Sequence, residues 1–378
     1  MLPIDPSTDV PPGYTADQRN QPNGFIGDPD VMDTWATSSL SPQIAGKWED
    51  DADLFGRIFP MDLRPQAHDI IRTWLFSTVV RSNFEHDSLP WKNAALSGWI
   101  LDPDRKKMSK SKGNVVTPVD LFEKFGSDAV RYWAASARPG IDTAFSEDQM
   151  KVGKKLATKL LNATKFVLTF PQPNVDAKPT HPVDLAMLAR VAETVREATV
   201  AFDQYDYARA LERTEAMFWW FCDDYVELVK GRVYNSQGLD ASGSAISALR
   251  LALSALQRLL APFMPFTTET VWRWWKDGSV HTATWPTAAE LGPIGDSTIL
   301  DPIGEILSQV RRAKTDAKTS QKTAVTEATV SATEAVLTAF ELGRGDLSDA
   351  GSVRSWDTVA STNETTVSAV LAPPEPAS

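Results

Sequence analysis

Residues 106–114 carry the feature that most limits the structures open to this chain, the basic run Lys-Lys-Met-Ser-Lys-Ser-Lys-Gly-Asn. The run follows an apolar segment at 95–101 and precedes Val-Val-Thr-Pro at 115–118. Lysine offers a compact, flexible charge with three donors, which suits a polyphosphate, while serine adds neutral donors and glycine lets the backbone approach closely. We therefore predict a phosphate-binding loop after a strand. The alternative is a solvated surface loop, which is what most lysine clusters are.

The composition is that of an ordinary folded protein. The chain has 378 residues, enough for two or three domains, with 42% hydrophobic and 23% charged residues. Its one cysteine, Cys222, excludes an internal disulfide and fits a reducing compartment. Because Cys222 follows the apolar run 218–221, we expect it in the core. No window reaches the roughly 18 apolar residues of a membrane span, so we predict a soluble, cytoplasmic protein without membrane contact.

The charge balance restricts how this chain can bind nucleic acid. The formal net charge is −11 and the pI about 5.0, which argues against a uniformly basic surface. A nucleic-acid partner must therefore bind local basic patches. The four histidines have no metal-ligand spacing with one another or with the cysteine, so we expect no protein metal site.

The first third of the chain shows α/β patterning. We expect an irregular lead-in over 1–30, a strand at 58–63, a helix from Asp69, and a strand at 91–101. Asp69 is either a helix N-cap or a carboxylate that binds a ribose at a strand-to-helix crossover. Trp35 has small neighbours at 36–39, so its ring can form a pocket wall, although core packing is the commoner role of such a residue.

A helical pattern begins at Met150. We predict further helices over 184–203, 207–233 and 243–277, joined by short turns as in an antiparallel bundle. Four lysines recur at helical spacing near its start, and we weigh a solvated face equally against phosphate contacts. These are Lys151, Lys154, Lys155 and Lys159.

The last part of the chain returns to mixed patterning. A helix at 303–318 carries a second basic cluster, Arg311, Arg312, Lys314 and Lys318. Strands at 325–331, 355–360 and 365–371 and a helix at 333–342 indicate a small appended α/β unit. We therefore predict three domains, at 1–148, 149–298 and 299–378.

Three motifs in fixed order resemble the valyl-tRNA synthetase family, in the isoleucine, valine and leucine group of class I aminoacyl-tRNA synthetases. They are Asp-Val-Met-Asp-Thr-Trp at 30–35, Arg-Pro-Gln-Ala-His-Asp-Ile-Ile-Arg-Thr-Trp at 64–74, and Lys-Met-Ser-Lys-Ser at 107–111. The similarity covers roughly residues 1–325. It implies the second half of a Rossmann-like catalytic domain, followed by a helical-bundle anticodon-binding domain and the small α/β appendix.

The resemblance also implies functional residues. Lys107 and Lys110 would bind the ATP phosphates, within an ATP-binding segment that includes Met108, Ser109 and Ser111. Asp69 would bind the ribose, and Trp35 and Trp74 would form walls of the amino-acid pocket. tRNA contacts are expected from Lys151, Lys154, Lys155, Lys159, Arg311 and Arg312. The implied substrates are valine, ATP and tRNA(Val), and Mg²⁺ is expected with ATP, although no protein ligand for it is identified.

One departure from the family pattern is large. Class I enzymes bind ATP between the lysine loop and a His-x-Gly-His signature, and none of the four histidines here has that arrangement. The resemblance therefore implies a C-terminal portion of a valine–tRNA ligase that needs an upstream half, which would be a separate chain if the enzyme is split. The alternatives are a non-catalytic tRNA-binding remnant and a relative specific for isoleucine or leucine.

Overall fold

The computed structural model describes residues 5–28, 34–171 and 178–373, apart from the side chain of Lys110. Residues 30–33 of the first sequence motif lie outside the described residues. The chain divides into two compact units, Met1–Trp99 and Ile100–Ser378. This division differs from the three domains expected above, whose boundaries stay a prediction.

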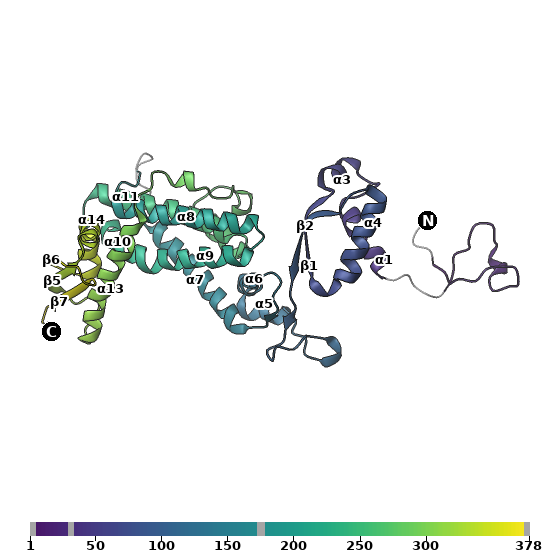
Figure 1. Cartoon of the computed structure of the whole chain (residues 1–378), viewed down its shortest axis with the longest axis horizontal. Helices are drawn as coiled ribbons and strands as arrows, with labels where there is room; N and C mark the ends of the chain where they lie inside the picture. The colour runs from purple at the N-terminus through teal and green to yellow at the C-terminus, as the bar shows by residue number, and fades with distance from the viewer. Residues whose placement is uncertain (1–4, 29–33, 172–177, 374–378) are drawn as a thin grey trace. The chain divides into compact units, whose positions relative to one another are not determined.

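The first unit contains a small parallel sheet and the helix that connects its strands (Figure 1). Strands β1 (Met61–Ala67) and β2 (Trp91–Ser97) pair from Met61–Trp91 to Ala67–Ser97. A parallel pair needs a crossover connection, and α4 (Phe76–His86) supplies it. The remaining elements are η1 (Ala16–Gln18), α1 (Thr34–Ser38), α2 (Ser41–Ala45), α3 (Ala52–Ile58), η2 (His68–Ile70) and the π-helical turn η3 (Ile71–Leu75).

Two expectations for this unit were wrong in their boundaries. The strand expected at 58–63 begins at Met61, because α3, capped by the Asp51 side chain, extends to Ile58. Asp69 lies inside η2 and is not an N-cap, since that position belongs to Ala67.

The second unit begins with the segment that carries the lysine loop. The strand expected at 91–101 is two strands, because β2 ends at Ser97 and β3 (Ile100–Leu101) pairs with a different partner, β4 (Thr143–Ala144). Between β3 and β4 lie η4 (Lys110–Lys112), α5 (Val119–Phe125) and α6 (Ser127–Ala135).

A helical bundle follows and contains most of the buried core. Its elements are α7 (Glu147–Thr169), α8 (Pro182–Asp203), α9 (Tyr207–Trp220), the π-helical turn η5 (Phe221–Tyr225), α10 (Val226–Val233), α11 (Leu239–Leu260) and α12 (Pro265–Trp272). The helix expected at 243–277 is two helices because the chain turns between Ala261 and Met264 and restarts at Pro265, which occupies a first-turn position. Cys222 is buried in this core as expected, and burial raises the pKa of its thiol to about 12.

The C-terminal unit is confirmed as a small α/β structure. After η6 (Val280–Thr282), η7 (Ala288–Leu291) and η8 (Ser297–Ile299), it comprises α13 (Leu300–Asp316), β5 (Val325–Ala332), α14 (Glu334–Gly351), β6 (Trp356–Ala360) and β7 (Thr366–Leu371). Strand β5 is central, parallel to β6 and antiparallel to β7. The order predicted from the sequence, α/β, then all-α, then a small α/β unit, is therefore confirmed.

A buried ionic network fixes this unit to the bundle. Arg232 of α10 donates to Asp184 of α8 at 2.7 and 2.8 Å and to Asp346 of α14 at 2.6 Å. Tyr225 and Ser244 also donate to Asp184, at 2.7 and 2.6 Å. A buried charge is tolerated only when such partners compensate its lost hydration. The network therefore depends on the relative positions of α8, α10 and α14.

Candidate functional site

The lysine loop is built on a short hairpin in the second unit. Leu101 of β3 forms an antiparallel bridge with Lys107, and the backbone N–H of Asp102 donates to the carbonyl of Lys106 at 2.9 Å. Arg105 turns the chain with a φ of +61°, and Gly113 closes the loop with a φ of +67°. Among the described atoms, none lies within 4 Å of the position that a Cβ at Gly113 would occupy, so the backbone conformation is what favours glycine there.

Asp102 and Asn114 join the two ends of this loop. The Asn114 side-chain amide donates to Asp102 Oδ2 at 2.8 Å, while Asp102 Oδ1 accepts from the Lys106 backbone N–H at 2.8 Å. Asn114 Oδ1 in turn accepts from the backbone N–H of Ser109 at 2.9 Å. Asp102 is largely buried, and these hydrogen bonds, led by the Lys106 N–H, lower the pKa of its carboxyl group. The backbone at Lys106 and Ser109 is thus fixed by one carboxylate and one amide.

The predicted ATP-binding residues of the loop lie on this frame. Lys107 is exposed, and Met108 and Ser109 are partly exposed. The Ser109 and Ser111 hydroxyls are 3.2 Å apart, so both face the same side of the turn. Lys110 begins η4, and its side chain lies outside the described part of the chain. The loop therefore presents two neighbouring hydroxyls and the exposed residues Lys106, Lys107 and Lys112, and lysine and serine are suitable donors for phosphate oxygens.

Asp69 lies where β1 passes into helix in the first unit. It is exposed, in the second position of η2, directly after the carboxyl end of a parallel strand. The chain continues through the π-helical turn at Ile71–Leu75, a rare geometry that often occurs at functional sites. This is the crossover position expected for a ribose-binding carboxylate.

Trp74 and the helix that carries Trp35 contact each other in the same unit. The indole N–H of Trp74 donates to the backbone carbonyl of Ser38, the last residue of α1, at 2.5 Å. The guanidinium of Arg64 lies 3.1 Å from the centre of the Trp74 ring. Trp35 and Trp74 are both half-buried. One face of Trp74 is thus occupied by Arg64, and the role of both rings as pocket walls stays a prediction.

Asp69, Trp35 and Trp74 belong to the first unit, whereas the lysine loop belongs to the second.

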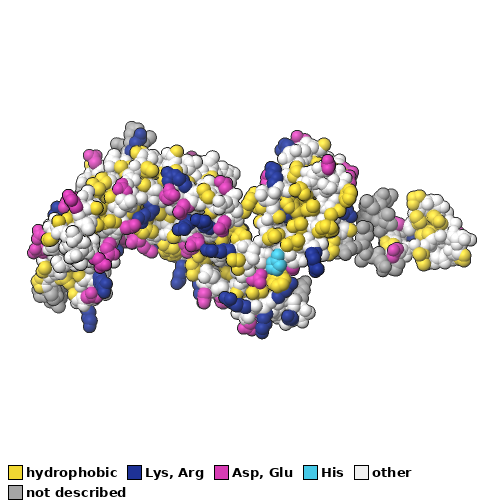
Figure 2. All heavy atoms as spheres, viewed as in Figure 1, with side chains coloured by type: hydrophobic (Ala, Val, Ile, Leu, Met, Phe, Trp, Pro, Cys, Tyr) yellow, Lys and Arg dark blue, Asp and Glu magenta, His cyan; other side chains and the backbone are white. Residues whose placement is uncertain are grey.

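The lysines of α7 line a surface hollow of about 740 Å³. We define this lysine hollow by Lys124, Lys151, Lys154, Lys155, Lys159 and Trp219. Three of its lysines have acidic partners: Lys124 with Glu147 at 2.7 Å, Lys151 with Asp148 at 2.8 Å, and Lys159 with Asp223 at 2.6 Å. The four lysines expected to form one basic stripe are thus on one surface, with Lys124 of α5 beside them. Figure 2 shows the wider setting, with basic side chains lying among acidic ones over the bundle.

The second basic cluster is not a continuous patch. Arg311 lines a different cavity, of about 150 Å³, together with Asp224. Arg312 is exposed, and its Nε lies 3.8 Å from an Asp316 oxygen. Lys314 was wrongly counted with this surface, since it is 1% exposed and its ammonium donates to the carbonyls of Gln321 and Gly351. Lys314 therefore stabilises the C-terminal unit.

Sequence reasoning missed Asp102, Lys124 and Trp219. Asn114 was visible as the last residue of the basic run, but nothing marked its bond to Asp102, twelve residues earlier. A carboxylate directly after a strand and before a basic run is the one signal that would have indicated Asp102. Lys124 and Trp219 join the α7 lysines only through tertiary packing.

No group of three or more His, Cys, Asp or Glu side chains suited to a metal ion occurs among the residues described. Within the same residues, no helix combines the length and apolar character needed to cross a membrane.

Two family models match the chain. Residues 14–146 match tRNA synthetases class I (I, L, M and V), and residues 184–330 match the anticodon-binding domain of tRNA ligase. The first match contains Asp69 and the lysine loop, and the second begins within α8 and contains α9 to α13.

Two curated relatives carry the name valine–tRNA ligase. The chain is 60% identical over 359 residues to a valine–tRNA ligase of Thermobifida fusca, a match that covers 93% of this chain and 40% of that protein. It is 56% identical to the valine–tRNA ligase of Salinispora arenicola, over 94% of this chain and 44% of that protein. The chain therefore spans less than half the length of these relatives.

Solved structures share the fold. A LeuRS–tRNA–LeuAMS ternary complex from Agrobacterium radiobacter K84 aligns with a TM-score of 0.58 at 20% identity, over 71% of this chain and 35% of that one. Methionyl-tRNA synthetase of Mycobacterium tuberculosis, in complex with methionyl-adenylate, aligns with a TM-score of 0.51 at 23% identity, over 63% of this chain and 48% of that one. The two family models therefore show that the chain contains a class I tRNA synthetase region at 14–146 and an anticodon-binding domain at 184–330, and the curated relatives that it matches over 93–94% of its length are valine–tRNA ligases.

Proposed function

We propose that the chain is the portion of a valine–tRNA ligase that supplies the lysine loop and the tRNA-binding helices, and that it acts with an upstream part of the catalytic domain. The observation that carries this proposal is the 60% identity to a valine–tRNA ligase across 93% of the chain. The upstream part would carry the His-x-Gly-His signature, either on a separate polypeptide or on the same one. Relatives named for valine, and not for isoleucine or leucine, favour valine as the amino acid.

The reaction has two steps. A carboxylate oxygen of valine attacks the α-phosphorus of ATP, and the bond to pyrophosphate breaks as the new bond forms. A ribose hydroxyl at the 3′ end of tRNA(Val) then attacks the valyl carbonyl and displaces AMP. Negative charge grows on pyrophosphate during the first step. Lys107 and Lys110 would stabilise that charge, and the benefit would arise mainly in the transition state.

The frame around Asp102 supports this role for the loop. Because Lys106 and Ser109 are fixed through Asp102 and Asn114, the backbone that carries Lys107, Met108 and Ser109 is ordered before ATP binds. Preorganised donors need little rearrangement during the reaction, which is where much of their catalytic effect originates. Ser109 and Ser111 would add neutral hydrogen bonds to the phosphates.

Asp69, Trp35 and Trp74 would act on the other parts of the substrates. Asp69, exposed at the carboxyl end of β1, would accept hydrogen bonds from the ribose hydroxyls of ATP. Trp35 and Trp74 would enclose the valine side chain. Their contact through Ser38 keeps α1 against the π-helical turn, so movement of one would shift the other.

Magnesium would be bound chiefly by the triphosphate and by water. Mg²⁺ commonly uses substrate phosphates with one or two carboxylates, in place of an all-protein cage. The described residues contain no cluster of three potential ligands, so they do not fit a resident metal site. We place the activity in the cytoplasm, in keeping with the single reduced thiol, Cys222.

For tRNA, we propose that the helical bundle and the lysine hollow bind the phosphate backbone, with Arg311 and Arg312 as further contacts. Support comes from the anticodon-binding family model and from the five lysines around one hollow. An electrostatic interface of this kind loses affinity steeply as salt rises. A labelled tRNA(Val) transcript titrated at several salt concentrations would measure this slope.

The second candidate function is tRNA binding without catalysis. The absence of a His-x-Gly-His sequence from these 378 residues favours it for the isolated chain. Valine-dependent exchange of pyrophosphate into ATP separates the two functions. We expect exchange when the upstream part is supplied, and its loss in Lys107→Ala. Exchange that stays absent with a folded upstream part, while tRNA still binds, would favour the remnant.

A further inference from the structure

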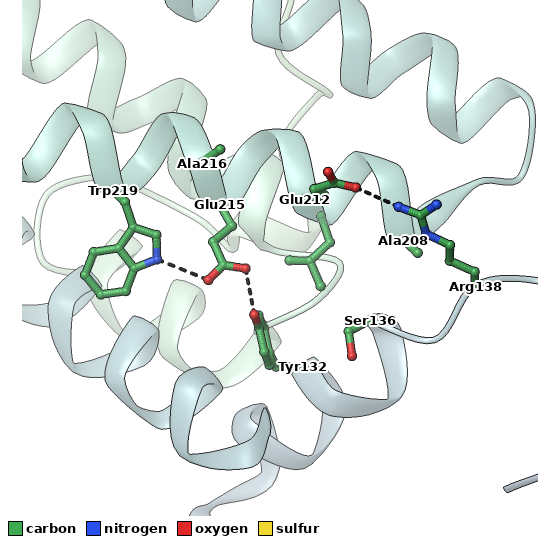
Figure 3. A pocket seen from close by; sticks show the side chains of 9 residues that line it. Tyr132, Ser136, Arg138, Ala208, Glu212, Glu215, Ala216 and Trp219 are labelled. Carbon is green, nitrogen blue, oxygen red and sulfur yellow. Dashed lines mark hydrogen bonds and ion pairs between the residues drawn. The ribbon is translucent and has the colours of Figure 1, made fainter. Parts of the chain in front are cut away.

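Trp219 of α9 lies between two surface hollows of opposite charge. On one side is the lysine hollow. On the other is a groove of about 380 Å³ between α6 and α9, shown in Figure 3. We define this carboxylate groove by Tyr132, Ser136, Arg138, Glu212, Glu215 and Trp219. Trp219 is the residue that lines both hollows.

Hydrogen bonds fix the position of the Trp219 ring. Its indole N–H donates to Glu215 Oε1 at 3.1 Å, and the other oxygen of Glu215 accepts from the Tyr132 hydroxyl at 2.7 Å (Figure 3). This pair holds the phenol neutral, since burial and the Glu215 carboxylate raise the pKa of Tyr132. Across the ring, Lys159 Nζ lies 6.0 Å from the ring centre. A half-buried tryptophan held in this way is a rigid surface for stacking.

The segment that forms one wall of the groove is fixed to the bundle. Asp128 of α6 accepts from the backbone N–H groups of Phe266 and Thr267 at 3.2 and 2.6 Å, and Arg131 donates to the carbonyl of Pro262 at 2.9 Å. The groove is thus part of the folded framework and does not depend on a mobile loop.

The lysine hollow and the carboxylate groove differ in charge, and therefore in the groups that they can bind. Five lysines surround the lysine hollow and three of them have carboxylate partners, so positive charge is in excess there. Among the described residues, Lys155 has no ion-pair partner. In the groove, Glu212 pairs with Arg138 at 3.1 Å, whereas the donors to Glu215 in the described part of the chain are the neutral groups of Trp219 and Tyr132. Phosphates are therefore attracted to the first side and repelled from the second.

We infer that Trp219 and the two hollows beside it bind an unpaired nucleotide of the tRNA, an inference that rests on the proposed function. The phosphates lie over the lysine hollow, the base stacks on Trp219, and the base edge faces Glu212 and Glu215. Carboxylates accept hydrogen bonds from the exocyclic amino groups of cytosine and adenine, as they do from cytosine N4 in DNA grooves. Uracil lacks an amino group, so the site favours cytosine or adenine over uracil.

The test uses the whole 378-residue chain and fluorescein-labelled hexamers of ribocytidine and ribouridine, with a tRNA(Val) transcript in parallel. Anisotropy titrations give the affinities. Trp219→Ala should lower affinity for the cytidine hexamer about tenfold, since stacking of a base on an aromatic ring is worth roughly that much, without changing the salt slope. Lys155→Glu should lower affinity for both hexamers and flatten the slope. Glu212→Gln should narrow the preference for cytidine over uridine.

Trp220→Ala is the matched control. Trp220 is the next residue on α9 and is also half-buried, but its ring packs against Arg190, whose guanidinium lies 4.4 Å from the ring centre. Its replacement should leave RNA affinity unchanged. Trp219→Phe keeps a ring without the N–H and should give an intermediate affinity, which tests the site if Trp219→Ala fails to fold.

Unchanged affinity in folded Trp219→Phe and Trp219→Ala, or an equal loss in Trp220→Ala, would overturn the inference. Equal binding of the two hexamers by the parent chain would also refute the base-edge assignment. Pyrophosphate exchange does not use this surface. A chain that supports exchange while its Trp219 variants bind RNA normally would therefore disprove this inference and leave the proposed function standing.

Discussion

Asn114 donates its side-chain amide to Asp102 across twelve residues, at 2.8 Å, and so ties together the two ends of the lysine loop. The same amide group accepts from the Ser109 N–H, inside the loop. Fixing a flexible segment costs conformational entropy, about 1–2 kcal/mol per residue, and these two side chains help to offset it. The residues proposed to bind phosphate are therefore ordered by two residues that need not touch the ligand.

Asn114→Ala should loosen the loop without unfolding the chain. Loss of the amide leaves Asp102 Oδ2 without its Asn114 donor and releases Ser109, so the lysines become better substrates for a protease. Limited trypsin digestion followed by mass spectrometry should show faster cleavage at 106–112. Asn83→Ala, an exposed position on α4, is the control and should leave the cleavage rate unchanged. Equal rates in the two variants would mean that the pair does not restrain the loop.

Lys110→Ala should act on the rate of adenylation. In the chain supplied with its upstream half, removal of one preorganised donor should raise the barrier by about 3 kcal/mol, a loss of 100-fold or more in kcat. The Michaelis constant for valine should change little, because the lysine is proposed to face phosphate. Steady-state pyrophosphate exchange gives both constants. A raised Michaelis constant for valine with an unchanged kcat would show that Lys110 has a different role.

Trp74→Ala should alter selectivity. Removing the ring opens space for the extra methylene of isoleucine, a discrimination worth about 1–3 kcal/mol, and also withdraws the surface on which Arg64 lies. Trp74→Phe keeps a ring but loses the bond to the Ser38 carbonyl, and serves as the control for lost packing. Exchange kinetics with valine and isoleucine should show a reduced preference in the alanine variant only. If both variants kept the preference of the parent chain for valine over isoleucine, Trp74 would be a core residue and not a pocket wall.

The sequence predicted elements best where one local pattern was sufficient. The last two strands were expected at 355–360 and 365–371 and are observed at Trp356–Ala360 and Thr366–Leu371, because side chains alternate between the two faces of a strand. The prediction of one helix over 243–277 was wrong at Pro262 and Pro265. The apolar pattern continues through these residues, but proline lacks the N–H that a helix interior needs, so the helix is interrupted there.

The site was predictable only in part, and for a similar reason. The lysines of the loop stand together in the sequence, whereas the Asp102–Asn114 bond and the position of Trp219 beside Lys159 depend on folding. Lys314 shows the opposite error. Its position in the sequence placed it with Arg311 in a basic cluster. Packing of α14 against α13 buries Lys314, and its ammonium donates hydrogen bonds to backbone carbonyls.

Asp346 should make stability depend on pH. Burial raises the pKa of its carboxyl group to about 6, above the unfolded value of about 3.9, despite the opposing effect of Arg232. Folding therefore takes up a proton between these values, and the contribution of this group, complete below about pH 4, is lost as pH rises through 6. Asp346→Asn retains an acceptor for Arg232 and should remove this part of the pH dependence. Urea unfolding from pH 4.5 to 7.5 would measure it, and identical profiles for both proteins would contradict the assignment.

The chain alone should not form valyl-adenylate. Class I chemistry requires the His-x-Gly-His signature and the lysine loop to hold ATP in register, and proximity of this kind is worth several kcal/mol of the barrier. None of the four histidines lies in that sequence. Of the two signatures, only the lysine loop would therefore stabilise the negative charge of the triphosphate. The purified protein would be incubated with valine, ATP, Mg²⁺ and labelled pyrophosphate, and no exchange above background is expected. Exchange that Lys110→Ala abolishes would show that these 378 residues contain a complete adenylation site.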